Sequence, residues 1–317
     1  MTLNKNCLIG YSGTIGSHIL EKKKFNYKYN SKNIEQIQKK NFDFTICCAA
    51  PGSMQFANKN PKEDSKKINN LMKYLRTFET KKFVLISTIQ VYSKLNNKNN
   101  HEFSKKLKKK FPYGKNRRKL EIFCENRFDN ILIIRLPSVF GKYIKKNFIF
   151  DIKNPMPTFI YQKKFLLIYK IIPKDLRKAF ISIYKKKGNA YFINRVRFKK
   201  NLKNKKLMNF FEKKNLLSTS FTNPNSKYQF YNLKNIYKDI SVGLKYKIKY
   251  LNLASEPIKA SEIYRLINKK KMKPNGSKKY EANMISKYAQ IWSSKKNYLY
   301  NKKDILLELK KLAKANV

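Results

Sequence analysis

The chain has 317 residues, of which 42% are hydrophobic and 14% aromatic. This is enough apolar material for one large α/β domain with an added lobe, or for two domains, and it excludes a disordered basic tail. No uncharged apolar run approaches the roughly 20 residues that a membrane-spanning helix needs, and no secretory signal is recognisable at the start. We therefore expect a cytoplasmic protein without a membrane span.

The charge balance is strongly positive. Lys and Arg number 73 against 19 Asp and Glu, which gives a formal net charge of +54. Such an excess is typical of proteins that bind nucleic acid or anionic surfaces, but here the lysines are spread along the whole chain. We interpret the excess as a compositional bias and do not expect nucleic acid as a partner. The runs 106–110 and 199–206 are predicted to be solvated loops.

The cysteines indicate reduced thiols in the core. Cys7, Cys47, Cys48 and Cys124 lie in or beside apolar segments without the spacing of a metal site. Cys47 and Cys48 are neighbours in a predicted strand, so their side chains point to opposite faces. No metal centre and no disulfide is predicted.

A glycine turn is the first feature that indicates function. The apolar run 7–9 is followed by Gly10, Gly13 and Gly16, a pattern that predicts a strand, a sharp turn and a helix over residues 14–24. Glycines at this spacing let the backbone approach a pyrophosphate, which would bind the amides at the helix N-terminus.

The second predicted strand, residues 26–30, bears on the choice of cofactor. In dinucleotide-binding folds an acidic residue often follows this strand and holds the adenosine ribose. Here the strand ends in Asn30, Ser31 and Lys32, with no carboxylate. This favours NADP over NAD, with Lys32 as the partner of a 2′-phosphate.

The following segments alternate between strand and helix patterns. This alternation predicts a parallel, doubly wound sheet of the Rossmann type. Residues 145–225 are Lys-rich and irregular, with mixed helical pieces, and we expect them to form a smaller, mixed C-terminal substrate lobe. We therefore divide the chain into a dinucleotide-binding domain, 1–145, and a mainly substrate-binding lobe, 146–317, with about 226–245 returning to the first domain. The predicted elements are a helix at 33–40, a strand at 42–50, a helix at 64–78, strands at 82–88 and 130–137 around a helix at 113–126, strands at 228–231 and 247–253, and helices at 233–244, 260–269 and 303–314.

Three polar residues form a candidate catalytic group. Thr88 ends a predicted strand at the edge where ligands bind, and Tyr113 and Arg117 lie four residues apart on one face of the following helix. A guanidinium beside a phenol lowers the pKa of the phenol. Tyr113 could then act as a general acid or base on a hydroxyl or ketone, with Thr88 hydrogen-bonded to the same oxygen.

These segments together resemble the extended short-chain dehydrogenase/reductases, the nucleotide-sugar epimerase/dehydratase group. The turn at 10–16 is similar to the family's GxxGxxG, and residues 43–50 resemble its strand ending in Ala-Ala. Residues 86–92, Ile-Ser-Thr-Ile-Gln-Val-Tyr, resemble S-S/T-x-x-V-Y. Residues 113–121 resemble Y-G-x-x-K-x-x-x-E, and residues 134–141, Ile-Arg-Leu-Pro-Ser-Val-Phe-Gly, resemble R-x-x-x-V-Y-G. The resemblance covers residues 1–150 strongly and recurs more weakly at 228–263.

The resemblance implies a role for each matching residue. Tyr113 would be the catalytic acid/base, Thr88 its hydroxyl partner and Arg117 the neighbouring cation. The predicted cofactor contacts are Gly10, Gly13, Thr14, Ile15 and Gly16 at the pyrophosphate, Asn30 and Lys32 at the ribose, and Ala49, Ala50 and Pro137 along the rest of the dinucleotide.

Two departures from the family pattern affect the predicted chemistry. Arg117 stands where the family usually has Lys, and Arg for Lys is not a conservative exchange at a positioned site. Ile89 and Gln90 stand where the family's 4,6-dehydratases have Asp-Glu, and neither side chain can carry a proton. The resemblance therefore disfavours a 4,6-dehydratase.

The resulting prediction is an NAD(P)-dependent oxidoreductase or epimerase that acts on a nucleotide-linked sugar by hydride transfer. Arg195 or Arg197 is a candidate ligand of the substrate diphosphate. One alternative is a non-catalytic dinucleotide-binding protein that associates with nucleic acid through its basic surface. Another is reduction of a small ketone that is not a sugar. The sugar, the choice between NAD and NADP, and a homodimeric state stay open.

Overall fold

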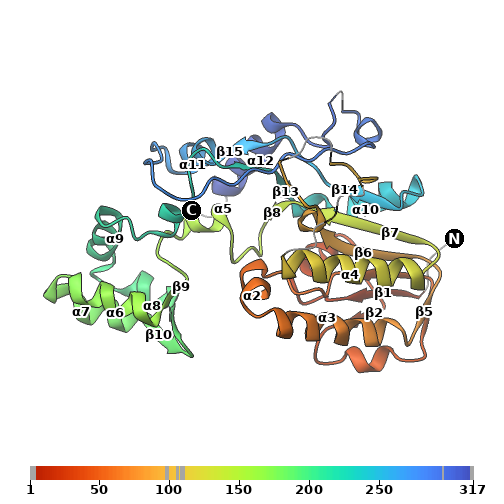
Figure 1. The fold of residues 1–317 in the computed structure, drawn as a ribbon, viewed down its shortest axis with the longest axis horizontal. Helices are drawn as coiled ribbons and strands as arrows, with labels where there is room; N and C mark the ends of the chain where they lie inside the picture. Colours follow the sequence, from red (N-terminus) through yellow and green to blue (C-terminus); the bar gives the residue numbers. More distant parts are fainter. Residues whose placement is uncertain (1–4, 97–99, 105–106, 108–110, 295, 315–317) are drawn as a thin grey trace. The chain divides into compact units, whose positions relative to one another are not determined.

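The computed structural model describes residues 5–96, 100–104, 107, 111–294 and 296–314, and its course is drawn in Figure 1. The chain divides into two compact units. The first comprises Met1–Ile144, Lys227–Ile258 and Glu281–Val317, and the second comprises Lys145–Ser226 and Lys259–Tyr280. The first unit thus takes more of the C-terminal half than the residues 226–245 expected from the sequence. That the second unit binds substrate stays a prediction.

A six-stranded sheet forms the centre of the first unit. Its strand order is β14-β7-β6-β4-β1-β2, and each pair of neighbours is parallel. The chain leaves β1 for β2 on one side and then returns to β4 on the other. This reversal of order beside β1 is where ligands bind in open parallel sheets. The predicted fold class, a doubly wound Rossmann-type sheet, is confirmed.

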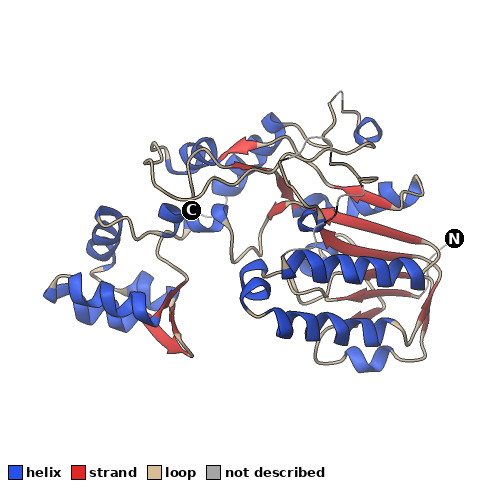
Figure 2. Ribbon diagram, viewed as in Figure 1, coloured by secondary structure: helices blue, strands red, loops and turns tan. Residues whose placement is uncertain are grey.

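Helices and short strands connect the sheet strands of this unit (Figure 2). In chain order the elements are β1 (Asn6–Ile9), α1 (Thr14–Leu20), β2 (Tyr27–Tyr29), the 3-10 helix η1 (Ile34–Ile37), β3 (Asn41–Phe42), β4 (Phe44–Cys47), α2 (Met54–Lys59), α3 (Pro61–Leu75), β5 (Glu79–Thr80), β6 (Phe83–Thr88), η2 (Ile89–Val91), α4 (Pro112–Arg127), β7 (Ile131–Leu136), β8 (Ser138–Phe140), β12 (Lys227–Tyr228), β13 (Phe230–Asn232), η4 (Leu233–Asn235), α10 (Ile236–Lys245), β14 (Tyr250–Asn252), β15 (Ile258–Lys259), which reaches the unit boundary, η5 (Ala289–Trp292) and α12 (Lys302–Lys314).

Apolar side chains cover both faces of the sheet, because all residues of its inner strands β1, β4 and β7 are buried. In β6, Val84 belongs to the hydrophobic cluster on one face and Leu85 to the cluster on the other. The first cluster includes residues of α1 and α10. The second includes residues of α3 and α4, which Figure 1 draws along one face of the sheet. Cys47 and Cys48 pack into opposite clusters, as expected, and all four cysteines are free.

The second unit contains strands that the sequence did not indicate. Residues 145–225 were expected to be irregular with helical pieces, and this expectation was wrong, because β10, β11 and β9 form an antiparallel sheet in that order. The strands are three or four residues long, and β10 reads Tyr-Lys-Lys-Lys, which resembles a solvated loop. Pairing with β11 makes it a strand. The elements are α5 (Phe148–Lys153), β9 (Phe159–Tyr161), α6 (Gln162–Ile171), α7 (Lys174–Ile183), β10 (Tyr184–Lys187), β11 (Ala190–Ile193), α8 (Arg195–Lys200), α9 (Asn204–Lys213), η3 (Ser218–Phe221) and α11 (Ala260–Asn268).

Smaller differences concern individual elements. The helix expected over residues 14–24 ends at Leu20, and the run 199–206 lies partly in α8 and α9 rather than wholly in a loop. Of the run 106–110, only Leu107 lies inside the described residues. Within the residues that the structure describes, no helix is long and apolar enough to cross a membrane, and no cluster of potential metal ligands occurs.

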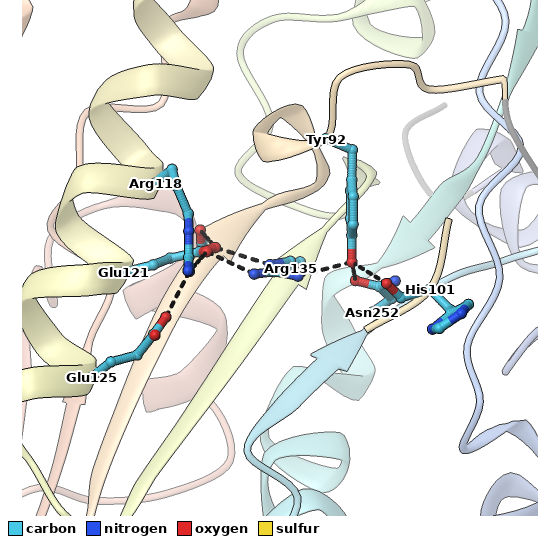
Figure 3. A network of polar contacts seen from close by, with 8 residues as sticks. Tyr92, His101, Arg118, Glu121, Glu125, Arg135 and Asn252 are labelled. Carbon is cyan, nitrogen blue, oxygen red and sulfur yellow. Dashed lines mark hydrogen bonds and ion pairs between the residues drawn. The ribbon is translucent and has the colours of Figure 1, made fainter. Parts of the chain in front are cut away.

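A buried polar network joins the central strands to α4 (Figure 3). Arg135 on β7 donates two hydrogen bonds to Glu121 on α4, at 3.0 and 2.8 Å. Ser87, at the end of β6, donates to the same carboxylate at 2.6 Å. Arg135 also donates to the Tyr92 hydroxyl at 2.9 Å, and that hydroxyl lies 3.0 Å from Oδ1 of Asn252 on β14. The network therefore fixes α4 relative to the carboxyl ends of three strands.

We expect Glu121→Gln to lower the free energy of unfolding by about 3–5 kcal/mol, because it leaves Arg135 as a buried charge without its counter-ion. Urea denaturation followed by circular dichroism measures this. Glu63→Gln, which removes a solvent-exposed partner of Lys67 on α3, is the control and should cost under about 1 kcal/mol. Equal losses in the two variants would show that the network contributes no special stability.

Candidate active site

The glycine turn after β1 is a backbone cradle with no room for side chains. Gly10 has φ +91°, and a Cβ there would lie 2.8 Å from the backbone nitrogen of Ala49. A Cβ on Gly16 would lie 2.4 Å from the carbonyl oxygen of Gly10. Gly13 is the N-cap of α1 and offers no capping side chain. The first amides of the helix, from Thr14 onward, therefore lack a side-chain cap.

The turn lies beside two other predicted cofactor segments. The Gly10 amide donates to the carbonyl of Tyr29 at 2.7 Å, which places the end of β2 next to the turn. There the Asn30 side chain accepts from the Lys32 amide at 2.9 Å, and Lys32 itself is exposed. On the other side of Gly10 stands Ala49, after β4. The structure thus brings three segments to one edge of the sheet: the glycine turn, the end of β2 and the residues after β4. The sequence predicted that all three contact the cofactor.

Thr88 and Tyr113 meet at the same edge, where β6 ends and α4 begins. The Tyr113 side chain lies close enough to Thr88 for the threonine hydroxyl to lower its pKa, and that hydroxyl accepts from the Gln90 amide at 3.2 Å. The Tyr113 amide donates to the side chain of Asn58 on α2 at 3.1 Å. Pro137, which is buried, follows the residue that pairs with Thr88 on β7. The structure therefore places the side chains of Thr88 and Tyr113 beside each other.

Arg117 is buried, and Asp64 neutralises its charge. Its guanidinium carbon lies 4.0 Å from the centre of the Tyr113 ring, and the side chain is only 2% exposed. One terminal nitrogen forms an ion pair with Asp64 of α3, and the other donates to the carbonyl of Pro51. Asn116 donates to the same Asp64 oxygen at 2.7 Å. Arg117 thus connects α4 to α3 and to the loop after β4.

The net effect on Tyr113 differs from the sequence expectation. Burial raises the pKa of Tyr113, and this outweighs the lowering by Arg117 and by the hydrogen bond with Thr88. Asp64 adds a further small rise through its negative charge. The expectation that Arg117 would leave Tyr113 with a lowered pKa was therefore wrong. The structure therefore favours the protonated form of the phenol.

Sequence reasoning missed the residues that hold the group together. Asp64 lies in the first turn of α3, where an acidic residue is common at any helix N-terminus, and Asn58 lies in a short polar helix. No spacing relative to Tyr113 could have indicated either, because their elements meet only in the folded chain. Pro51 contributes a backbone carbonyl, which has no sequence signal.

A family model matches the segment that carries most of the candidate site. The family model described as "NAD dependent epimerase/dehydratase family" matches residues 24–162. The matched segment contains Thr88, Tyr113 and Arg117 and begins after the glycine turn. No curated protein matches the chain.

Solved structures of similar fold are epimerases and reductases. A dTDP-4-dehydrorhamnose reductase from Bacillus anthracis, in complex with NADP, aligns with a TM-score of 0.60 at 12% identity over 98% of each chain. RMD from Pseudomonas aeruginosa, complexed with NADPH, aligns with a TM-score of 0.60 at 13% identity over 99% of this chain and 100% of that one. A UDP-N-acetylglucosamine 4-epimerase from Methanobrevibacter ruminantium, in complex with UDP-N-acetylmuramic acid, gives 0.57 at 14% identity over 99% and 98%. At these identities the likeness establishes a shared fold.

At the glycine turn the chain offers a pyrophosphate the first amides of α1, which no side chain caps. The fit is different at Arg117. In the resemblance this position carries a Lys that also hydrogen-bonds the nicotinamide ribose, whereas both terminal nitrogens of Arg117 are already used. Arg117 therefore supplies a fixed, neutralised cation under the Tyr113 ring.

The predicted diphosphate ligands have their own contacts in the second unit. Arg195 donates to the Thr158 hydroxyl at 2.9 Å, and its guanidinium carbon lies 5.0 Å from the centre of the Phe150 ring. Arg197 is exposed on α8. A pocket of about 110 Å³ lies elsewhere in this unit, beside Tyr264 and Lys271. That Arg195 or Arg197 binds the substrate diphosphate stays a prediction.

We expect Gly16→Ala to weaken NADPH binding by at least about tenfold, because the new methyl group collides with backbone in the cradle. Quenching or enhancement of NADPH fluorescence at high salt measures this, since salt screens nonspecific attraction to the basic surface. Gly276→Ala is the matched control, because a Cβ there meets nothing within 4 Å. Wild-type affinity in Gly16→Ala would remove the dinucleotide site from the glycine turn.

Proposed function

We propose that this protein is an NAD(P)-dependent oxidoreductase or epimerase that acts on a nucleotide-linked sugar by hydride transfer. The observation that carries the proposal is the proximity of Tyr113 to Thr88, at the sheet edge that also carries the glycine turn. The substrate class is supported by the nucleotide sugars and NADP cofactors named for structures of the same fold.

The chain's own residues supply proton transfer and positioning. When bound, the nicotinamide cofactor supplies or accepts the hydride. Tyr113 donates its phenolic proton to the oxygen of a ketone, and Thr88 hydrogen-bonds that oxygen and orients the phenol. Arg117 stabilises the phenolate that forms, because its charge lies against the ring. The first backbone amides of α1, from Thr14 to Gly16, would hold the pyrophosphate.

The raised pKa of Tyr113 suits proton donation to a ketone better than proton removal from an alcohol. Burial raises the pKa of Tyr113, so the phenol is protonated at neutral pH and ready to donate. An epimerase must first oxidise its substrate with Tyr113 as a base. We therefore propose a keto-reductase first and an epimerase second. The absence of a carboxylate at Asn30 and the exposed Lys32 support NADP as the preferred cofactor.

A non-catalytic dinucleotide-binding protein is the second candidate. The sequestration of Arg117 by Asp64 and Pro51 is the observation that favours it. The two proposals differ in whether the protein oxidises bound NADPH when a substrate is present. Saturable NADPH binding that Gly16→Ala abolishes, without oxidation of NADPH by any member of a panel of keto-sugar nucleotides, would favour the second candidate.

We expect Tyr113→Phe to lower kcat for NADPH-dependent reduction by about 10²–10⁴-fold, because the general acid is lost. The NADPH dissociation constant should stay unchanged. Stopped-flow absorbance at the nicotinamide band measures the chemical step, and Tyr246→Phe, at an exposed tyrosine of the first unit, is the control. Retention of kcat in Tyr113→Phe would contradict the assignment of the acid.

The pH dependence should reflect the raised pKa of Tyr113. Below that pKa the phenol stays protonated, so kcat for reduction is expected to be level from about pH 6 to 9. The reverse oxidation needs the phenolate and should rise about tenfold per pH unit over the same range. A bell-shaped reduction profile with a limb near pH 7 would show that another group donates the proton.

A further inference from the structure

The outward face of α6 in the second unit exposes aliphatic side chains. Leu166, Leu167 and Ile171 are 48%, 55% and 56% exposed. Lys163 and Lys170 lie on the same face, since helical residues at these spacings share a side. We call these five residues the α6 surface. It is unusual because soluble proteins seldom group large aliphatic side chains on one exposed helix face.

The exposed aliphatic residues are not surplus core residues. The opposite face of α6 already contributes Phe165 and Ile168 to the core of its unit. The Phe165 ring stacks on Tyr191 of β11 with 3.7 Å between ring centres, and it also stacks on Phe180 of α7 at 4.5 Å. The helix therefore has a complete inward contact, and its outward apolar groups are left for another partner.

The segment that contains the α6 surface is more one-sidedly basic than the chain as a whole. Residues 156–217 contain 18 Lys and Arg against two acidic residues, whereas the whole chain has 73 against 19. No acidic residue occurs between Asp151 and Asp175. The partner of this surface is therefore anionic as well as apolar.

We propose that the α6 surface docks the protein on an anionic lipid bilayer. Leu166, Leu167 and Ile171 would enter the boundary between headgroups and acyl chains. Lys163 and Lys170 would reach the headgroup phosphates while their aliphatic stems lie on the apolar layer. Stable peripheral binding needs two signals acting together, and α6 provides an apolar insertion and a basic patch.

Nucleic acid fits this surface less well. A nucleic-acid interface takes up phosphates with basic and polar groups and bases with aromatic side chains. Exposed leucine and isoleucine at the centre of the patch gain little there, whereas a bilayer removes them from water. The aliphatic residues thus decide between two anionic partners that the lysines alone would not distinguish.

The test is co-sedimentation of the full chain with vesicles of phosphatidylcholine and phosphatidylglycerol (3:1), with pure phosphatidylcholine vesicles as reference. We expect binding to the anionic vesicles only, and Leu167→Ser should weaken it by about fivefold or more. Leu307→Ser, at a leucine of α12 that is 49% exposed in the first unit, is the matched control and should bind like wild type. Circular dichroism verifies that each variant is folded.

Charge is tested by Lys163→Gln/Lys170→Gln against Lys23→Gln/Lys28→Gln, at exposed lysines of the first unit. Only the first pair should weaken vesicle binding. Equal effects of Leu167→Ser and Leu307→Ser, or of the two lysine pairs, would overturn the proposal in favour of diffuse attraction to the basic surface. It would also be overturned if the vesicles did not bind and a fluorescent single-stranded oligonucleotide bound through Lys163 and Lys170.

Discussion

The buried ion pair between Glu121 and Arg135 is the interaction on which the candidate site depends. It joins α4 to β7, and Ser87 attaches β6 to the same carboxylate. Thr88 is the next residue of β6, and Tyr113 lies two turns before Glu121 on α4. The geometry of the proposed acid and its hydroxyl partner is therefore set by a charge pair that itself takes no part in the chemistry. Such a pair tolerates little change, because removing one partner leaves the other charge buried.

A second buried pair, Asp64 with Arg117, sets the electrostatics. In the resemblance a Lys beside the tyrosine both lowers its pKa and contacts the cofactor. Here Arg117 lies against the Tyr113 ring, but Asp64 and the Pro51 carbonyl occupy its terminal nitrogens. The cation stays near the phenol while its net effect is reduced. Burial of the phenol raises its pKa by more than the charge of Arg117 lowers it.

Several features were predictable from the sequence because they depend on neighbours along the chain. The glycine spacing at 10–16, the alternation of buried strands and helices, and the four-residue spacing of Tyr113 and Arg117 are of this kind. Motif residues such as Ser87, Glu121 and Arg135 were recognised, but their joint function as one network was not. The β-sheet of the second unit was missed because its strands are only three or four residues long and β10 is lysine-rich, so that only pairing with β11 makes them strands.

The sequence by itself determined the Rossmann-type sheet and the glycine turn, because local periodicity and backbone requirements specify them. Its motifs also predicted Thr88 and Tyr113 as site residues. The tertiary structure alone decided that Arg117 is neutralised by Asp64, that Tyr113 stays protonated, and that α6 presents aliphatic side chains outward. These properties arise from contacts and burial between elements far apart in the sequence. The sequence gives the formal charge of a side chain, but the strength of its electrostatic interactions depends on the groups that the fold places beside it.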